Sequence, residues 1–533
     1  MLGLDERSSI SSDTGFADIR TALAHLKAGR DAEAVRMLTS ITRQEQLPAH
    51  YWMELGMCLR RKGSLHAALG CYQAAAEAGI EQDALFMTRM ANIHADLDHL
   101  NRAISFSSKA LQKANNGTIR ANHAKILRAH KEFQQAYDMF STLVEEEPGN
   151  KDYHWEKAFT RMYLGLDRSA WKGFQVRFDV DKIPSPPAAD YLPRWQGEPL
   201  AGKRLLLTHE QGFGDTILML RYVHILKEMG ATVILECQPE LNRLVEGLPL
   251  DGIVKRGTQR DIQADYYCPL MSLPAFLWQD DSPPPPPARL TVPEGAKKDS
   301  RKLFLFPEDH KLNVGIVWSG SKTFADNRRR SVDVDRFLDL AILHNDCRFF
   351  SLQKGPGTQD LYRTGGQFLI RDAGPGLRDF ADTAALIERL DIIVMTDSSV
   401  AHLAGSLGKP VLNLLNYNPY WLYFPDGPET LWYPSMFLLR QDSPGNWDGV
   451  FQNASNILSH LARTKSTLGR RISAAQVEQS LQTYMSALEK GEPPIVSRTD
   501  ITADMTRMDP QQVSRKVTPT SCLESVSWDF FPV

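Results

Sequence analysis

The spacing of apolar residues changes twice along the chain, and each change predicts a different kind of structure. In the first third, apolar residues recur one helical turn apart, whereas from residue 203 onward short apolar runs alternate with amphipathic stretches. After about residue 465, one amphipathic stretch is followed by polar sequence without a period. Helical spacing predicts packed helices, and short apolar runs bounded by turn residues predict buried strands. We therefore expect a helical part, an α/β part and a tail.

The helical part repeats itself at intervals of 33 to 35 residues. An alanine recurs at this interval, and the residue one helical turn later is bulky in four of the five copies. The five pairs are Ala34 and Leu38, Ala68 and Tyr72, Ala103 and Ser107, Ala136 and Phe140, and Ala170 and Phe174. Such a repeat predicts a solenoid of helix pairs rather than a bundle with accidental spacing. The pattern resembles the tetratricopeptide repeat, in which an alanine lets two antiparallel helices approach closely.

Two α/β units follow the repeats. In the first, LLLT precedes the glycine-bearing turn HEQGFGDT, the amphipathic stretch ILMLRYVHILKEM and the run TVILE, which predict strand, turn, helix and strand. In the second, VGIVW, FFSL, DIIVMT and PVLNLL predict strands, with helices near residues 336–343 and over SSVAHLAGSLG. Such units build parallel sheets, which bind ligands at the carboxyl ends of their strands. We expect a ligand cleft between two Rossmann-like halves.

Proline-rich connectors and the changes of period mark the boundaries of the parts. The fold class that we expect is an all-α solenoid followed by an α/β region of two Rossmann-like halves. The expected parts are the repeat solenoid (15–180), a linker (181–201), the N-terminal half (202–288), the C-terminal half (289–465), and a helix with a disordered tail (466–533).

Composition and charge narrow the range of partners. Lys and Arg together number 61 and Asp and Glu 64, which gives a net charge of −3. Binders of nucleic acids or anionic membranes usually carry a basic excess, so neither partner is expected. The chain begins without the apolar core of a signal peptide, no run approaches the length of a membrane span, and the six cysteines form no CxxC pair. We expect a cytoplasmic protein without a disulfide scaffold.

The turn after LLLT is the first of four that carry candidate chemistry. It contains Gly212, Gly214, Asp215 and Thr216. Glycines let the backbone approach a substrate, and Asp215 lies at the entrance to the following helix. The sequence leaves two interpretations of Asp215 open, a carboxylate that faces a substrate and a simple helix cap.

The second and third turns offer cations. Lys322 and the run NRRRS, which contains Arg330, follow the first strand of the second half, and Lys354 follows FFSL. Basic side chains in this position suit a phosphate group. The alternatives are a solvated charge run and an ordinary surface lysine.

The fourth turn, TDSSVAH, joins a buried strand directly to a helix. The first amide groups of such a helix are unsatisfied donors, and together with the helix dipole they suit a diphosphate. Asp397, Ser398, Ser399 and Val400 begin this helix, and His402 follows within its first turn. The alternative is that Asp397 or Ser398 caps the helix and His402 packs in the core.

Other common catalytic patterns are missing from the sequence. The pairs Asp179–Asp181 and Asp333–Asp335 do not lie at strand ends, and no cluster has the spacing of metal ligands. There is neither a GxSxG nucleophile elbow nor a Walker phosphate loop. We expect no metal and no organic cofactor.

The region from about residue 193 to 451 resembles bacterial GT-B glycosyltransferases of the heptosyltransferase type (family 9). The segments that carry the likeness are WQGEPLAGKRLLLTHEQGFGDT, GIVWSGS, NRRRS, DFADTAALIERLDIIVMTDSSVAHLAGSLGKPV, WYPSMFLLRQ and NWDGVF. With the repeats, the likeness covers residues 15–460. The layout is similar to bacterial tetratricopeptide-repeat glycosyltransferases, which include flagellin-modifying enzymes, and to the O-GlcNAc transferase. It implies a GT-B fold and metal-independent, inverting transfer from a nucleotide-sugar to a protein that the repeats select.

The resemblance also implies roles for single residues. Asp215 matches the general base, with Glu210 or His209 as the next candidates. Asp397, Ser398, Ser399 and His402 match the nucleotide-sugar motif. Arg330 falls near the cation that neutralises the donor phosphate, but the loop lengths differ, so Arg329 and Lys322 are alternatives.

Two other functions stay open at this stage. One is transfer to lipopolysaccharide or polysaccharide, with the repeats docking a complex, although heptosyltransferases proper lack repeats. The other is a repeat scaffold whose GT-B region no longer catalyses a reaction.

Overall fold

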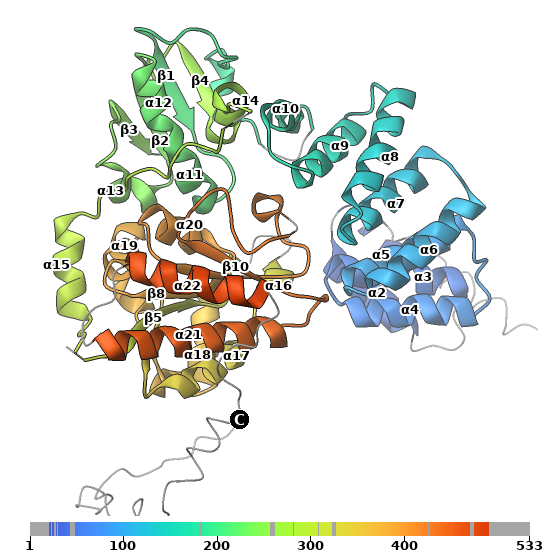
Figure 1. Ribbon diagram of the computed structural model, residues 1–533. Coiled ribbons are helices and arrows are strands. Elements are labelled where there is room, and N and C mark those ends of the chain that lie inside the picture. The colour runs from blue at the N-terminus through green and yellow to red at the C-terminus, as the bar shows by residue number, and fades with distance from the viewer. Residues whose placement is uncertain are drawn as a thin grey trace, which may run out of the picture. The chain divides into compact units, whose positions relative to one another are not determined.

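The structure is a computed structural model that describes residues 21–489, apart from 23, 26–27, 29, 43–47, 181–183, 256–261, 281, 308, 322–326, 425 and 469–473. Helices precede two parallel sheets along the chain (Figure 1). The helical part contains α2 (Asp31–Thr42), α3 (Ala49–Arg61), α4 (Leu65–Glu77), α5 (Ala84–Asp96), α6 (Leu100–Lys113), α7 (Gly117–Ala129), α8 (Phe133–Glu146), α9 (Lys151–Tyr163), α10 (Arg168–Gly173) and the 3₁₀ helix η1 (Phe174–Phe178).

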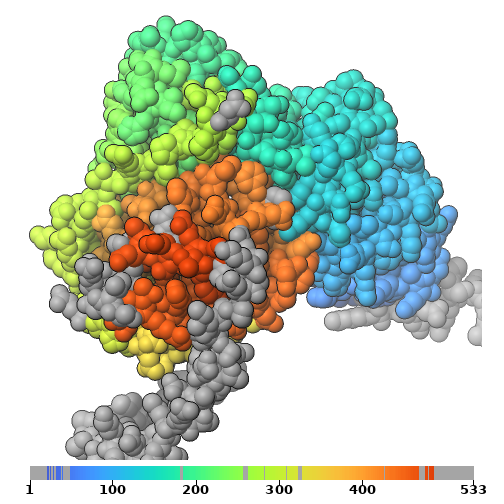
Figure 2. All heavy atoms as spheres, in the orientation of Figure 1, coloured from blue at the N-terminus to red at the C-terminus, as the bar shows by residue number. Residues whose placement is uncertain are grey.

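The repeated alanines lie on the second helix of each pair. All five of them are fully buried. The first helix adds a small residue at Gly56, where a Cβ atom would lie 2.6 Å from the ring of Tyr72 on α4. The small residues let the helices approach closely, and the helical part has a continuous outer surface in Figure 2 (blue to teal). The helix pairs predicted from the alanine spacing are therefore confirmed.

The first sheet has four parallel strands in the order β3-β2-β1-β4. The chain runs outward from β1 through β2 to β3 and returns to β4 on the other side of β1, so the topological switch point lies between β1 and β4. The strands are β1 (Arg204–Thr208), β2 (Thr232–Cys237), β3 (Gly252–Lys255) and β4 (Tyr266–Pro269). The helices are α11 (Phe213–Met219), η3 (Leu220–Tyr222), α12 (Val223–Glu228), η4 (Pro239–Leu241), α13 (Asn242–Val245), η5 (Leu270–Ser272) and α14 (Leu273–Leu277).

The second sheet has six parallel strands in the order β10-β9-β8-β5-β6-β7, and its switch point lies between β5 and β8. The strands are β5 (Leu312–Val317), β6 (Cys347–Ser351), β7 (Ile370–Asp372), β8 (Ile392–Thr396), β9 (Val411–Leu415) and β10 (Met436–Arg440). The α-helices are α15 (Glu294–Leu303), α16 (Asn327–Arg330), α17 (Val334–Leu340), α18 (Thr358–Arg363), α19 (Phe380–Ile387), α20 (Ser399–Ser406) and α21 (Asp448–Leu468). Single 3₁₀ turns are η6 (Ala341–Leu343), η7 (Gly355–Gly357), η8 (Gly366–Phe368), η9 (Gly374–Gly376) and η10 (Trp421–Tyr423).

The last repeat shares a hydrophobic core with both sheet-bearing halves. Trp171 of α10 is fully buried, and its ring centroid lies 5.4 Å from that of Trp421 in the second half and 6.5 Å from that of Trp278 in the first. Phe174 belongs to the same cluster, 5.8 Å from Trp421. Burial of four large aromatic rings stabilises this junction strongly, because each ring removes a large apolar area from water.

The predicted fold class, helix pairs followed by two parallel α/β halves, is confirmed. The chain divides into two compact units, Met1–Glu478 and Gln479–Val533, so the helix pairs and both sheets belong to one unit. The predicted helix after residue 465 is α22 (Ala474–Glu489). The predicted disordered tail, residues 490–533, lies outside the described residues. Within the described part of the chain, no helix combines the length and apolar character needed to cross a bilayer.

The tight helix crossings predict a test of the repeats. Replacing Ala136 with Leu inserts three carbons at a fully buried position on α8 and should lower the free energy of unfolding by about 1 to 3 kcal/mol. Urea unfolding followed by circular dichroism measures this change. Gln134→Leu places the same side chain at an exposed position of α8 and should leave the urea midpoint nearly unchanged. Equal midpoints for the two variants would contradict the packing described here.

Candidate catalytic site

A cavity of about 1070 Å³ lies between the two sheet-bearing halves. The turn after β1 forms one wall, and the turns after β5, β6 and β8 form the other. Parallel strands place their carboxyl ends at one edge of a sheet, so turns that are far apart in sequence meet there. Ten of the predicted site residues line the cavity: Gly212, Gly214, Asp215, Arg330, Lys354, Asp397, Ser398, Ser399, Val400 and His402.

Asp215 lies in the first turn of α11 and faces the cavity from the β1 side. Its Oδ2 atom accepts a hydrogen bond from the amide of Gly212 at 2.8 Å, so the carboxylate also caps the helix. Gln211 adopts a φ of +59°, which turns the chain sharply ahead of this cap. Burial, together with the nearby carboxylates of Glu210 and Asp397, raises the pKa of Asp215 to about 7, against the hydrogen bond from the amide of Gly212. A carboxyl group with this pKa exchanges a proton near neutral pH.

Helices α11 and α20 meet at Gly214. A Cβ atom on Gly214 would lie 2.7 Å from Cδ2 of His402 and 3.4 Å from the Cα atom of Ser399. The first turns of the two helices, one from each half, therefore touch through backbone and ring atoms. Glycine at this position lets the two halves close over the cavity.

Arg330 and Asp397 face each other on the opposite wall. Nη1 of Arg330 lies 3.6 Å from Oδ2 of Asp397, and Oδ1 of Asp397 accepts a hydrogen bond from the hydroxyl of Tyr423 at 2.9 Å. The guanidinium of Arg330 lies across Gly320, where a Cβ atom would be 2.5 Å from Nη2. Gly320 thus leaves the space that Arg330 occupies, and Arg330 brings a cation to the turn that begins α20.

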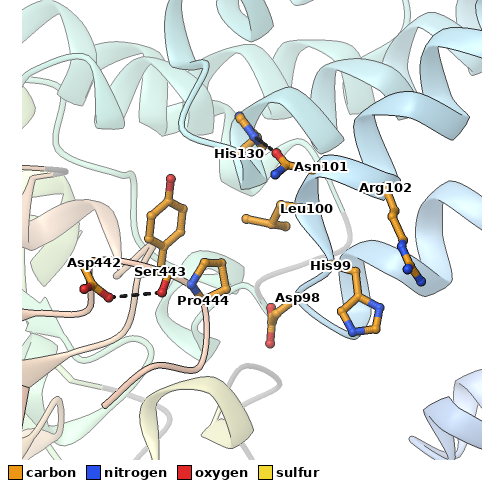
Figure 3. A pocket seen from close by; sticks show the side chains of 10 residues that line it. Asp98, His99, Leu100, Asn101, Arg102, His130, Asp442, Ser443 and Pro444 are labelled. Atoms are coloured by element: carbon orange, nitrogen blue, oxygen red, sulfur yellow. Dashed lines mark hydrogen bonds between the residues drawn. The ribbon is translucent and has the colours of Figure 1, made fainter. Parts of the chain in front are cut away.

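The neighbouring arginines point to the repeats instead. Nε of Arg329 lies 2.7 Å from Oδ1 of Asp98, and Arg328 donates to the carbonyl oxygen of Asp96 at 2.5 Å. Asp98 forms the turn between α5 and α6 and has a φ of +61°. Figure 3 shows Asp98 at a smaller cavity of about 520 Å³, opposite Asp442. Of the three arginines, Arg330 alone lines the larger cavity within the described residues.

The first residues of α20 present donors to the cavity. Ser398 precedes the helix in an extended conformation, and Ser399 and Val400 provide its first amide groups. The Oγ atom of Ser398 is buried and has no hydrogen-bond partner among the described residues. A free hydroxyl beside the first amides of a helix is a suitable contact for an anionic oxygen.

His402 is buried behind Gly214. Its Nδ1 atom lies 3.2 Å from the hydroxyl of Tyr433, and its Nε2 atom lies 3.5 Å from that of Tyr423. Burial lowers the pKa of His402 to about 4, with Arg221 and Arg330 acting in the same direction and Asp397 against it. The imidazole is therefore neutral near pH 7 and holds the two tyrosine hydroxyls in place.

The other predicted site residues lie at the cavity rim, away from the cavity, or outside the described residues: they are Lys354, Thr216 and Lys322. The ammonium of Lys354, at the cavity rim, donates to the carbonyl oxygen of Leu377. Thr216 is fully buried in α11, where its hydroxyl donates to Oε1 of Gln238 at 3.1 Å. It therefore does not line the cavity. Lys322 lies outside the described residues.

Tyr420 and Tyr423 are site residues that the sequence analysis did not single out. Tyr420 lines the cavity, and Tyr423 holds Asp397. A local signal was present, because the run NYNPYWLY follows the strand PVLNLL and places aromatic residues and a proline at a carboxyl strand end. Tyr433 comes from the segment WYPSMFLLRQ, which carries the family resemblance but precedes a strand rather than following one.

The described residues include no group of three or more His, Cys, Asp or Glu side chains placed to hold a metal ion. The polar groups at the cavity include the Asp215 carboxyl group on one wall, and Arg330, the Ser398 hydroxyl and the first amides of α20 on the other. This set can accept a proton on one wall and hold an anion on the other.

Known proteins share parts of this sequence and fold, although no profile of a known protein family matches the chain. Protein FlbA of Caulobacter vibrioides is 24% identical over 344 residues, which are 57% of this chain and 54% of FlbA. The chain thus spans about half the length of this curated relative.

Solved structures resemble separate parts of the chain. MamA (MSR-1) is 19% identical and covers 32% of this chain and 97% of its own, with a TM-score of 0.27. YrrB, a TPR protein with an unusual peptide-binding site, is 16% identical and covers 32% of this chain and 90% of its own, with a TM-score of 0.26. A glycosyl transferase family 9 protein from Veillonella parvula is 14% identical and covers 54% of this chain and 98% of its own, with a TM-score of 0.35.

The contact between Gly320 and Arg330 predicts how the anion side responds to substitution. Gly320→Ala should displace the guanidinium and weaken binding of inorganic diphosphate about fivefold, because a Cβ atom cannot lie 2.5 Å from Nη2. Isothermal titration calorimetry measures the affinity. Gly449→Ala is the matched control, because nothing lies within 4 Å of the added methyl group. Equal affinities for the two variants would contradict an anion site at Arg330.

Proposed function

We propose that this chain is a glycosyltransferase that moves a sugar from a nucleotide-sugar donor to a protein acceptor. The observation that carries the proposal is a single cavity with Asp215 on one wall and Arg330 and the start of α20 on the other. Sugar transfer from a diphosphate needs a base for the acceptor and positive charge for the leaving group. The two walls offer these groups from opposite sides.

On the donor side, the diphosphate would lie at the start of α20. Arg330 and the amides of Ser399 and Val400 would hold its oxygens, and the Ser398 hydroxyl would donate a further hydrogen bond. Asp397 carries negative charge beside this position. Tyr423 and Arg330 hold that carboxylate, so its role would be to orient Arg330.

On the acceptor side, Asp215 would act as the general base. Its carboxylate would take the proton of the acceptor group while that group attacks the anomeric carbon. The bond from the anomeric carbon to the diphosphate oxygen would break, and its electron pair would leave with the nucleoside diphosphate. Attack from the face opposite the leaving group inverts the configuration at the anomeric carbon. Glu210 is less suited to this role, because its carboxylate is paired with Arg177 at 2.9 Å.

The acceptor would reach Asp215 through the groove of the repeats. A second cavity of about 650 Å³ shares Gln211, Arg330, Asp397 and Tyr420 with the first. It continues along α5, α7 and α9, where Asn92, Lys125, Arg128, Trp155 and Phe159 line it. Amide, cationic and aromatic side chains suit an extended polypeptide, whose backbone and side chains offer complementary groups.

The first test of this proposal removes the base. Asp215→Asn keeps the size of the side chain but cannot accept a proton, so the transfer rate should fall by about 10²- to 10⁴-fold. Diphosphate affinity should stay within about twofold, since Asp215 lies on the other wall. Transfer is measured as sugar-sized mass added to acceptor protein, and Asp339→Asn, at an exposed position of α17, is the control. Full transfer by Asp215→Asn would show that another group is the base.

The pKa of Asp215 predicts the pH dependence. A base must be deprotonated, and its pKa is raised to about 7, so kcat/KM should rise with pH through neutrality and level off above about pH 8. An Asp with its ordinary pKa would instead give a rate that is level from about pH 5 upward. The profile of initial transfer rates between pH 5 and 9 separates these outcomes.

The acceptor class is tested by comparing intact protein masses in cells with and without the gene. Flagellin is the first protein to examine, because of the resemblance to flagellin-modifying enzymes. Loss of a sugar-sized mass from one protein, restored by the wild-type chain and not by Asp215→Ala, is the expected result. Unchanged protein masses together with a changed lipopolysaccharide would favour a glycan acceptor. Unchanged masses without donor hydrolysis would favour a scaffold.

A further inference from the structure

A buried ion pair joins the last repeat to the turn that carries Asp215. Arg177, on η1, is fully buried, and its Nη2 atom lies 2.9 Å from Oε1 of Glu210 in the turn after β1. Its Nε atom donates to Oε2 of the same carboxylate at 3.4 Å. Glu210 is itself 8% exposed. Two charges that have left water stabilise each other only when both are present and well paired.

Each nitrogen of the Arg177 guanidinium has a hydrogen-bond partner. Nη1 donates to the carbonyl oxygen of Phe174 at 3.0 Å, and Nη2 donates to the hydroxyl of Ser272 at 2.7 Å. The ring of Phe178 covers the guanidinium, with 4.1 Å between its centroid and Cζ. Ser272 follows β4 and Glu210 follows β1. Arg177 therefore contacts the segments that follow both strands at the switch point of the first sheet, the place where such sheets commonly take a ligand.

The position of Glu210 determines that of Asp215 within a few residues. Glu210 precedes Gln211, whose φ is +59°, and Gly212, whose amide donates to Oδ2 of Asp215 at 2.8 Å. Burial and pairing fix Glu210, the sharp turn at Gln211 fixes Gly212, and the hydrogen bond fixes the carboxylate. A shift of Glu210 would therefore move or release the Asp215 carboxylate.

The pair also governs the charge that Asp215 experiences. The ionisable groups near Asp215 are Glu210 in its own turn, Asp397 and His402 from the β8–α20 segment, and Tyr420 and Tyr433 from the second half. Arg330 lies beside Asp397. Glu210 disfavours ionisation of Asp215, and the guanidinium of Arg177 places an opposite charge 2.9 Å from the Glu210 carboxylate.

We propose that Arg177 is a positioning residue for Asp215, so that the last repeat completes the catalytic site in addition to any role of the repeats in selecting an acceptor. The inference rests on the proposed function in one respect, the role of Asp215 as the base. It differs from that function in assigning the repeat domain a part in the transfer step itself.

Three variants of the full chain test the proposal. Arg177→Met leaves the Glu210 carboxylate unpaired and should move the titration midpoint of Asp215 up by about 0.5 to 1 pH unit. Glu210→Gln leaves the guanidinium unpaired and should move it down by a similar amount. The double variant removes both charges and should return the midpoint to within about 0.3 pH unit of the wild type.

The midpoint is measured without any transfer assay. A water-soluble carbodiimide modifies protonated carboxyl groups, and peptide mass spectrometry gives the fraction modified at Asp215 at each pH. The matched control exchanges Arg120 for Met and Glu146 for Gln, a pair between α7 and α8 that is not among the groups acting on Asp215. This control should leave the midpoint unchanged. Circular dichroism reports whether each variant folds, and if Arg177→Met does not fold, Glu210→Gln and the double variant decide.

Opposite shifts that cancel in the double variant support the proposal, since loss of structure alone would not give two signs. Midpoints that do not move in either single variant, or single-variant shifts that the double variant does not reverse, overturn it. The pH profile of transfer is then compared with the labelling. Labelling midpoints that shift without a matching change in the transfer profile would contradict Asp215 as the base while leaving the positioning role intact.

Discussion

The close contact between Gly214 and His402 is the constraint on which the site depends. Each half of the α/β region places a short helix at the carboxyl edge of its sheet, and the two helices touch where one residue has no side chain and the other is a buried, neutral imidazole. Asp215 follows Gly214 by one residue, and the amides that open α20 precede His402 by two or three. The distance between Asp215 and the start of α20 is therefore determined by this close contact.

Each wall of the cavity carries an ionisable group with other charges beside it. Burial and two nearby carboxylates raise the pKa of Asp215 to about 7, and Arg330 is held by Asp397 beside the start of α20. A diphosphate on the second wall would add negative charge near Asp215 and so strengthen its tendency to take up a proton. In the proposed transfer, the leaving group would gain negative charge while Asp215 would lose its charge by taking up a proton.

The sequence predicted the features that local pattern determines. Alanines at a fixed interval predicted the helix pairs, and apolar runs between turn residues predicted most of the strands, because burial on both faces of a parallel sheet requires continuous apolar sequence. The resemblance brought Asp215, Asp397 and His402 into one site, and the geometry places all three at one cavity.

The sequence did not predict the features that depend on long-range contacts. Arg177 and Glu210 are 33 residues apart and belong to different parts of the fold, so no local pattern connects them. The same holds for Tyr433 beside His402. The sequence did not decide whether Arg329 or Arg330 faces the cavity, because the answer depends on the contact of Arg329 with Asp98, a residue from the repeats.

A crystal structure of the chain with a bound nucleoside diphosphate would test most directly whether one cavity holds both halves of the reaction. We expect the diphosphate oxygens within hydrogen-bonding distance of Arg330 and of the amides of Ser399 and Val400, with the terminal phosphate directed toward Asp215. A nucleotide bound elsewhere, or in this cavity with its phosphates away from Arg330 and α20, would contradict the assignment of the two walls.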